Sequence, residues 1–243
     1  MRVNRVFSEV PIGGRVQLEL TGTAANHIAR VLRLRVGEPL LLFDDAGGEY
    51  AAIVDAFTRD TVRVAVGEYL DVNRESPLQV TLAQGISRGE RMDVVVQKAT
   101  ELGVQRIVPV LAERTVVRLN AAQAANRLRH WRAIAIAACE QSGRNRLPEI
   151  TAPMSLQDFL VSDYLEGLRL VLSPDGGLRA RELPASPAAT LLIGPEGGLS
   201  DAERSAALAA QFTALILGPR ILRTETVALA ALAVALHRRG ELG

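Results

Sequence analysis

The stretch "IGPEGGLSDAE" (Ile193–Glu203) decides how the second half of the chain is interpreted. It follows the apolar run "ATLL" and places three glycines and a proline between residues 194 and 198. Ser200 and Glu203 then have the spacing of a helix capping box. In open α/β sheets, ligands bind beyond the carboxyl ends of the strands, and glycine lets the backbone approach a ligand closely. The stretch therefore predicts a binding loop between a buried strand and a helix.

Two further apolar runs end in comparable loops, "VLSPDGG" (171–177) and "LILGPRILRTET" (215–226). None of the three loops is a P-loop, which needs Gly-Lys-Ser/Thr, or the Rossmann pattern G-x-G-x-x-G. They contain no histidine and no cysteine. We expect the three loops to line one pocket and to hold a ligand mainly through backbone groups.

The pattern of apolar residues changes near residue 73. Before it, short runs separated by turn residues ("RVQLEL", "PLLLFD", "YAAIVDAF", "TVRVAV") are typical of a small β-barrel or sandwich. One helix, "AANHIARVLR", is predicted to bury Ile28, Val31 and Leu32. After residue 73, apolar strands alternate with helices, which indicates an α/β fold. We therefore predict two domains, 1–72 and 73–243.

The amino-acid composition limits the kinds of protein that this chain can be. The 243 residues are 48% hydrophobic and 23% charged, with one cysteine, Cys139. Neither a signal peptide nor a membrane span is expected, so the sequence predicts a cytoplasmic protein without disulfides. Cys139 lies between small apolar residues and is predicted to be a core residue. The three histidines lack the spacing of metal ligands, so no metal is expected.

Positive charge is concentrated although the net charge is only +1. Residues 1–35 contain six arginines and two acidic residues, and residues 113–146 contain seven arginines and two acidic residues. Such patches are either solvated surface arginines or sites for an anionic partner such as nucleic acid. Charge alone leaves both readings open.

Four segments in order resemble one family. They are "KATELGV" (98–104), "AIAACEQSGR" (135–144), "IGPEGGLSDAE" (193–203) and "LGPRILRTETVALAAL" (217–232). Together they look like the RsmE family, 16S ribosomal RNA uridine-N3 methyltransferases of the SPOUT superfamily, and the first 72 residues are similar to its PUA-like barrel. The resemblance implies S-adenosylmethionine as cofactor, a carboxyl-terminal trefoil knot and a homodimer with its site at the subunit interface. It also implies small-subunit rRNA as substrate, in the assembled 30S particle.

Carried over by position, the resemblance implies a cofactor site in the three loops. Backbone groups would bind the adenine and ribose, and aliphatic side chains would enclose the ring. These residues are Leu172, Ser173, Gly194, Pro195, Glu196, Gly197, Gly198, Leu217, Gly218, Ile221, Leu222 and Arg223.

The acceptor side requires a group that removes the proton from uridine N3 or stabilises the resulting anion. Glu225 and Arg223 are the candidates, and Arg220 binds either phosphate or uracil. Glu225 has a second interpretation, since a carboxylate also stabilises a helix amino terminus. The predicted RNA-binding residues are Arg2, Arg5, Arg30, Arg33, Arg144 and Arg146.

Two alternatives stay open at this point. One is a SPOUT enzyme that methylates the ribose or another base. The other is a non-catalytic RNA-binding factor for ribosome assembly, in which the loops are only structural.

Overall fold

The computed structural model describes residues 3–242, which form two compact units. The first consists of Met1–Glu75 with Ile136–Leu147, and the second of Ser76–Ala135 with Pro148–Gly243. The first unit thus includes a segment that the predicted boundary at residues 72 and 73 assigns to the second domain. In the described part of the chain, no helix combines the length and the apolar character needed to cross a bilayer.

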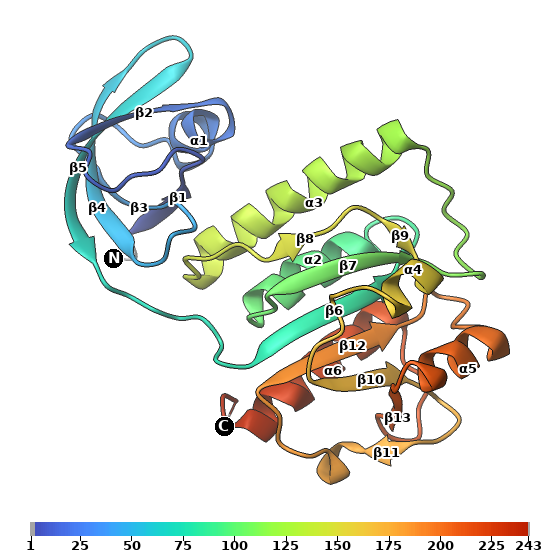
Figure 1. Ribbon diagram of the computed structural model, residues 1–243. Helices are drawn as coiled ribbons and strands as arrows, with labels where there is room; N and C mark the ends of the chain where they lie inside the picture. Colours follow the sequence, from blue (N-terminus) through green and yellow to red (C-terminus); the bar gives the residue numbers. More distant parts are fainter. Residues whose placement is uncertain (1–2, 243) are drawn as a thin grey trace. The chain divides into compact units, whose positions relative to one another are not determined.

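A curled five-stranded sheet forms most of the first unit (Figure 1). The strand order is β1-β3-β4-β5-β2, with β1 parallel to β3 and the other neighbours antiparallel. Two register shifts between β4 and β5 bend the sheet. The four predicted runs correspond to β2–β5, whereas β1 is too short for a recognisable pattern. The strands are β1 (Asn4–Phe7), β2 (Gln17–Thr21), β3 (Pro39–Phe43), β4 (Glu49–Phe57) and β5 (Thr61–Leu70).

The helix predicted in this unit has an irregular second half. The short helix α1 (Gly22–Asn26) continues as a π-helix, η1 (His27–Leu32), which ends at Arg33 in a left-handed conformation. A π-helix has more residues per turn than an α-helix, so the inward-facing positions shift. Ile28 is fully buried as predicted, but Val31 is 68% exposed. The prediction that Val31 faces the core was wrong for this reason.

The second unit contains an eight-stranded sheet in which every neighbouring pair is parallel. The order is β11-β13-β10-β12-β6-β7-β8, and β9 also pairs with β7. The strands are β6 (Gln79–Gly85), β7 (Arg106–Leu111), β8 (Glu149–Ile150), β9 (Met154–Ser155), β10 (Leu168–Leu172), β11 (Leu178–Arg179), β12 (Ala188–Ile193) and β13 (Thr213–Ile216).

Helices cover both faces of this sheet, as the continuous apolar strands predicted. Along β12, Leu191 and Ile193 pack in the cluster that contains Trp131 of α3 and residues of α2 and α6. Leu192 points to the opposite face and packs in the cluster formed with α4 and α5. The helices are α2 (Arg91–Glu101), α3 (Ala121–Ser142), α4 (Leu156–Leu160), α5 (Asp201–Ala209), α6 (Thr224–Arg239) and the 3₁₀ turn η2 (Ala180–Glu182).

Local sequence signals fix the amino end of α5 and the carboxyl end of α2. Ser200 caps α5, and its side chain and that of Glu203 form the predicted capping box. Gly103, just after α2, has a φ of +87°, the conformation that a carboxyl cap requires. Both predicted helix boundaries are confirmed.

Candidate functional site

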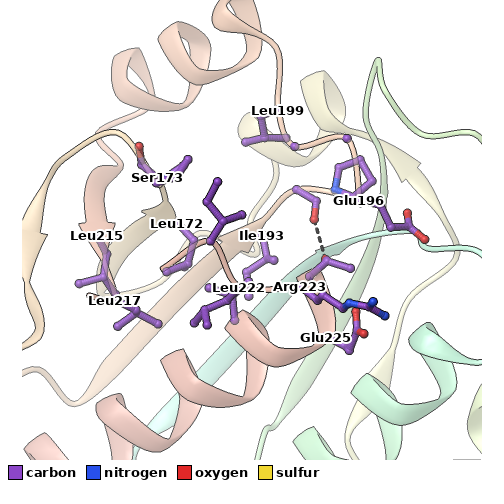
Figure 2. A pocket seen from close by; sticks show the side chains of 18 of the residues that line it. Leu172, Ser173, Ile193, Glu196, Leu199, Leu215, Leu217, Leu222, Arg223 and Glu225 are labelled. Carbon is purple, nitrogen blue, oxygen red and sulfur yellow. Dashed lines mark hydrogen bonds between the residues drawn. The ribbon is translucent and has the colours of Figure 1, made fainter. Parts of the chain in front are cut away.

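The carboxyl ends of three adjacent strands border a cavity of about 610 Å³ in the second unit. Strands β13, β10 and β12 are neighbours and run parallel, so the loops that follow them meet at one edge of the sheet. Figure 2 shows side chains from all three loops directed toward this space. The structure thus brings together the three loops in the pocket that the sequence predicted.

Every residue that the resemblance implied for the cofactor lines this cavity. Leu172, Leu217 and Leu222 supply aliphatic surface to the cavity (Figure 2). Further apolar residues of the wall were not predicted, because they belong to strands or to α6 or lie beyond the glycines: Ile193, Leu199, Leu215, Ile216 and Val227.

Glycines are required where the backbone segments around the cavity approach one another. A Cβ atom on Gly194 would lie 2.9 Å from the carbonyl carbon of Gly198, within the same turn. A Cβ atom on Gly85, at the end of β6, would lie 2.3 Å from the nitrogen of Pro195. Gly198 and Gly218 have φ values of +69° and +82°, which L-residues rarely adopt. The loops are therefore shaped by backbone packing as well as by the need to face a ligand.

Thr224 connects the cavity loops to the centre of the sheet. Its hydroxyl donates a hydrogen bond of 2.7 Å to the carbonyl of Gly194, drawn in Figure 2, and accepts one of 2.8 Å from Nε2 of Gln84. Both side chains are buried. The end of β6, the end of β12 and the start of α6 are thereby held together, although they are far apart in sequence.

Two carboxylates of the wall share one arginine that the sequence analysis did not single out. Arg91 donates from Nη1 to Oε1 of Glu196 at 2.7 Å, and its Nε atom lies 3.9 Å from Oε1 of Glu225. The backbone N–H of Arg88 also donates to Glu196, at 2.9 Å. Burial acts to raise the pKa of the Glu196 carboxyl, but the N–H groups of Arg88 and Glu196 and the guanidinium of Arg91 outweigh it. The pKa of Glu196 consequently lies below its ordinary value.

The three predicted catalytic residues all line the cavity. Glu225 lies in the first turn of α6 and its side chain is 19% exposed, whereas Arg220 and Arg223 are exposed. Within residues 3–242, the buried Oε2 atom of Glu225 has no hydrogen-bond partner. Its position suits a helix amino terminus and also leaves the carboxylate available to a ligand.

Other cations at the rim come from segments outside the predicted loops. Arg114, after β7, donates to the carbonyl of Gly197 at 3.0 Å, and Arg204 of α5 lies 3.7 Å from Asp175. Arg114 belongs to the arginine-rich stretch 113–146 noted in the sequence. Its place at the pocket follows only from the order of the strands in the sheet.

Two known domain families together match most of the chain. The RNA methyltransferase domain family matches residues 74–236, and the RNA methyltransferase PUA domain family matches residues 20–66. A ribosomal RNA small subunit methyltransferase E from Bacillus subtilis is 33% identical over 90% of this chain and 89% of its own length. The chain belongs to the RsmE family of RNA methyltransferases.

Solved structures of similar proteins have the same fold. A putative methyltransferase from Legionella pneumophila, solved with its bound cofactor SAM, is 40% identical, with a TM-score of 0.94 over 98% of both chains. An RsmE protein from Neisseria gonorrhoeae, bound to S-adenosyl methionine, is 35% identical, with a TM-score of 0.89 over 97% of this chain and 98% of that one. The predicted SPOUT-type α/β fold with a preceding PUA-like barrel is confirmed. The trefoil knot stays a prediction of the resemblance.

Arg5, predicted to bind RNA, is a buried structural residue of the PUA-like unit. Its Nε atom donates to Glu49 at 3.0 Å, and its other nitrogens bond to the Cys139 carbonyl and to the side chain of Asn145. A guanidinium with these partners and no exposed edge cannot hold a phosphate. The prediction for Arg5 was wrong because its partners lie 44 or more residues away.

Arg144 requires the same correction. It is buried, and its Nη2 atom donates to Oε2 of Glu75 at 2.7 Å. By contrast, Arg30 on η1 and Arg33 just after it are exposed. Arg146 is also exposed, and it donates a hydrogen bond of 3.0 Å to the carbonyl of Ala46. Arg2 lies outside the described residues.

Cys139 is fully buried beside Phe7 and Phe43, as expected for a core residue. Burial raises the pKa of its thiol to about 12, so the nucleophilic thiolate is scarce near neutral pH. A catalytic role for this cysteine has no support.

Proposed function

We propose that this RsmE-family protein methylates N3 of a uridine in small-subunit (16S) ribosomal RNA, with S-adenosylmethionine as methyl donor. The observation that carries the proposal is the cavity at the ends of β10, β12 and β13, which combines exposed loop backbone with leucine side chains. Family membership and the relatives named above, two of them solved with this cofactor, agree with it.

The residues of the cavity fit such a cofactor. An adenine ring needs apolar faces and hydrogen bonds at its edge, and leucines 172, 217 and 222 with the backbone of residues 194–198 and 217–223 would supply them. The cofactor supplies an electrophilic methyl group on a sulfonium sulfur, so no metal is required for the transfer.

The chain's own residues would prepare the acceptor. Glu225 would take the proton from N3, which leaves a lone pair and a negative charge on the uracil ring. Arg223 and Arg220 would stabilise that charge or a neighbouring phosphate from the loop beside Glu225. N3 is hidden inside a base pair, so the uridine must be presented unpaired.

Substrate binding is assigned to the first 72 residues together with exposed arginines. Arg30, Arg33 and Arg146 are the residues proposed to contact RNA phosphates. We also propose, from the resemblance, a cytoplasmic homodimer that acts on the assembled 30S particle.

The test is nucleoside analysis by mass spectrometry. Small subunits that lack the modification are incubated with the protein and S-adenosylmethionine, and 3-methyluridine is expected. The Glu225→Gln variant should lower the rate by at least about 100-fold, as loss of a general base does, whereas Glu9→Gln, at an exposed position, should not.

Other outcomes point to the alternatives. A different methylated nucleoside would mean a SPOUT enzyme with another acceptor. Failure of the protein to bind S-adenosylmethionine in calorimetry would favour a non-catalytic RNA-binding factor and would contradict the proposal.

A further inference from the structure

We propose that Arg91 is a positioning residue that holds the carboxylate of Glu225 at the pocket wall without forming a hydrogen bond to it. The inference rests on the proposed function, in which Glu225 accepts a proton from the substrate. Arg91 opens helix α2, next to the end of β6, and is not part of the three predicted loops.

Arg91 is itself held by Glu196. Its Nη1 atom donates to Glu196 at 2.7 Å, and the same carboxylate oxygen accepts from the backbone N–H of Arg88 at 2.9 Å. Glu196 is therefore anchored by a main-chain donor as well as by the guanidinium. The hydrogen bond fixes one nitrogen of the Arg91 guanidinium, and because the group is planar this also sets where its Nε atom lies.

Arg91 attracts Glu225 without donating a hydrogen bond to it. The Nε atom of Arg91 lies 3.9 Å from Oε1 of Glu225, close enough for charge attraction but too far for a hydrogen bond. The Oε2 atom is buried and, in the described part of the chain, has no hydrogen-bond partner. Arg91 thus attracts one oxygen of the Glu225 carboxylate, while the other keeps its capacity to accept a proton.

Glu225 has charged neighbours of both signs. Among the described residues, Arg91 of α2 lies 3.9 Å from Glu225, Arg223, which precedes α6, lies beside it in Figure 2, and Glu196 pairs with the same Arg91. Loss of the Arg91 charge would leave Glu196 and Glu225 facing each other with one cation fewer. A carboxylate in that situation binds its proton more tightly. Because a general base must be ionised to work, activity would then fail at a higher pH than in the wild-type protein.

The experiment compares the pH dependence of methyl transfer in three proteins. For Arg91→Gln we expect the acidic limb of the rate profile to move to higher pH, with much of the rate recovered at alkaline pH. Arg91→Lys keeps a charge and should move the limb less. Lys98→Gln is the matched control, because it removes a positive charge from the same helix at a position that pairs with Glu101 and does not line the cavity. It should leave the profile unchanged.

A second measurement separates this inference from the proposed function. NMR titration of ¹³C-labelled glutamate, with the Glu225 signal assigned from Glu225→Gln, reports the carboxyl directly and needs no turnover. A higher titration midpoint for Glu225 in Arg91→Gln is expected. An unchanged midpoint, or a rate lowered equally at every pH, would overturn the role of Arg91 even if 3-methyluridine forms. A shifted midpoint without any methyl transfer would support the positioning contact and count against the proposed function alone.

Discussion

At the scale of single residues, the pocket depends on two places where only hydrogen fits at Cα. Gly85 ends β6 against the peptide between Gly194 and Pro195, and Gly194 lies against the turn that it opens. Strand order explains the first contact, since β6 is the neighbour of β12 and both end at the same edge. The loop that we propose to bind the cofactor is thus held in place by a glycine more than a hundred residues earlier.

Gly85→Ala tests this dependence. The added Cβ would lie 2.3 Å from the nitrogen of Pro195 and 2.7 Å from the carbonyl carbon of Gly194, far inside normal contact distance. The loop must move, so we expect at least tenfold weaker binding of S-adenosylmethionine in calorimetry and a loss of about 1–3 kcal/mol in the free energy of unfolding. Gly13→Ala, where the nearest atom is a tyrosine hydroxyl at 3.3 Å, is the control. Unchanged affinity in Gly85→Ala would refute the dependence.

A residue of the site could be predicted where its neighbours in the sequence reveal its role. The glycines, proline and leucines of the three loops are contiguous in sequence and follow recognisable strands, so their pattern was sufficient. Gly85, at the end of β6, packs against the glycine loop, and Arg91 of α2 lines the cavity. Predicting either contact requires knowledge of the sheet order. Arg5 and Arg144 look like surface arginines in the sequence, because nothing local reveals the buried partners Glu49 and Glu75.

At the scale of elements, Thr224 joins three chain segments that meet at the site. The hydroxyl at the first residue of α6 bridges Gln84 at the end of β6 and Gly194 just after β12. A hydroxyl can donate and accept at once, so one side chain satisfies a carbonyl and an amide in a buried place. The position of α6, and with it that of Glu225, depends on this bridge.

Thr224→Val removes the bridge and keeps the shape of the side chain. The carbonyl of Gly194 and Nε2 of Gln84 would each lose a partner, which costs about 1–3 kcal/mol for a buried group. We expect urea titration to give a free energy of unfolding lower by about 2–4 kcal/mol and calorimetry to give weaker cofactor binding. Thr224→Ser should retain most of both properties, and Thr226→Val, at an exposed position, should change neither. Equal stability of Thr224→Val and wild type would contradict this role.

Length and periodicity determined which elements could be predicted. The strands of five or more residues and the helices α2, α3, α5 and α6 carry enough repeats to be recognised. The two-residue strands β8, β9 and β11 and the five-residue helix α4 contain less than two periods of any pattern, and they form where the rest of the sheet offers a partner. In η1 the apolar pattern is present, but the chain follows a π-helix and not an α-helix, so the predicted burial of Val31 was wrong.

At the scale of the whole molecule, the arginines have two separate tasks. In the first unit, Arg5 and Arg144 are buried against Glu49 and Glu75 and hold residues 136–147 to the amino-terminal sheet. Removing one member of a buried ion pair leaves the other charge without compensation, which is far more costly than losing an exposed charge. Each of these buried pairs is neutral, so a positive surface for RNA must come from exposed arginines such as Arg30, Arg33 and Arg146.

Two sets of variants separate these tasks. Arg5→Ala should lower the free energy of unfolding by about 3–5 kcal/mol. Arg30→Gln with Arg33→Gln should leave stability within about 0.5 kcal/mol of wild type but weaken binding to a 16S rRNA fragment, and the logarithmic salt dependence should decrease by about 0.7–0.9 per lost phosphate contact. Arg59→Gln, at an exposed turn position of the same unit, is the control for loss of charge alone. An unchanged salt dependence in the double variant would exclude η1 and Arg33 from the RNA-binding surface, because a guanidinium that contacts phosphate must release counterions when it binds.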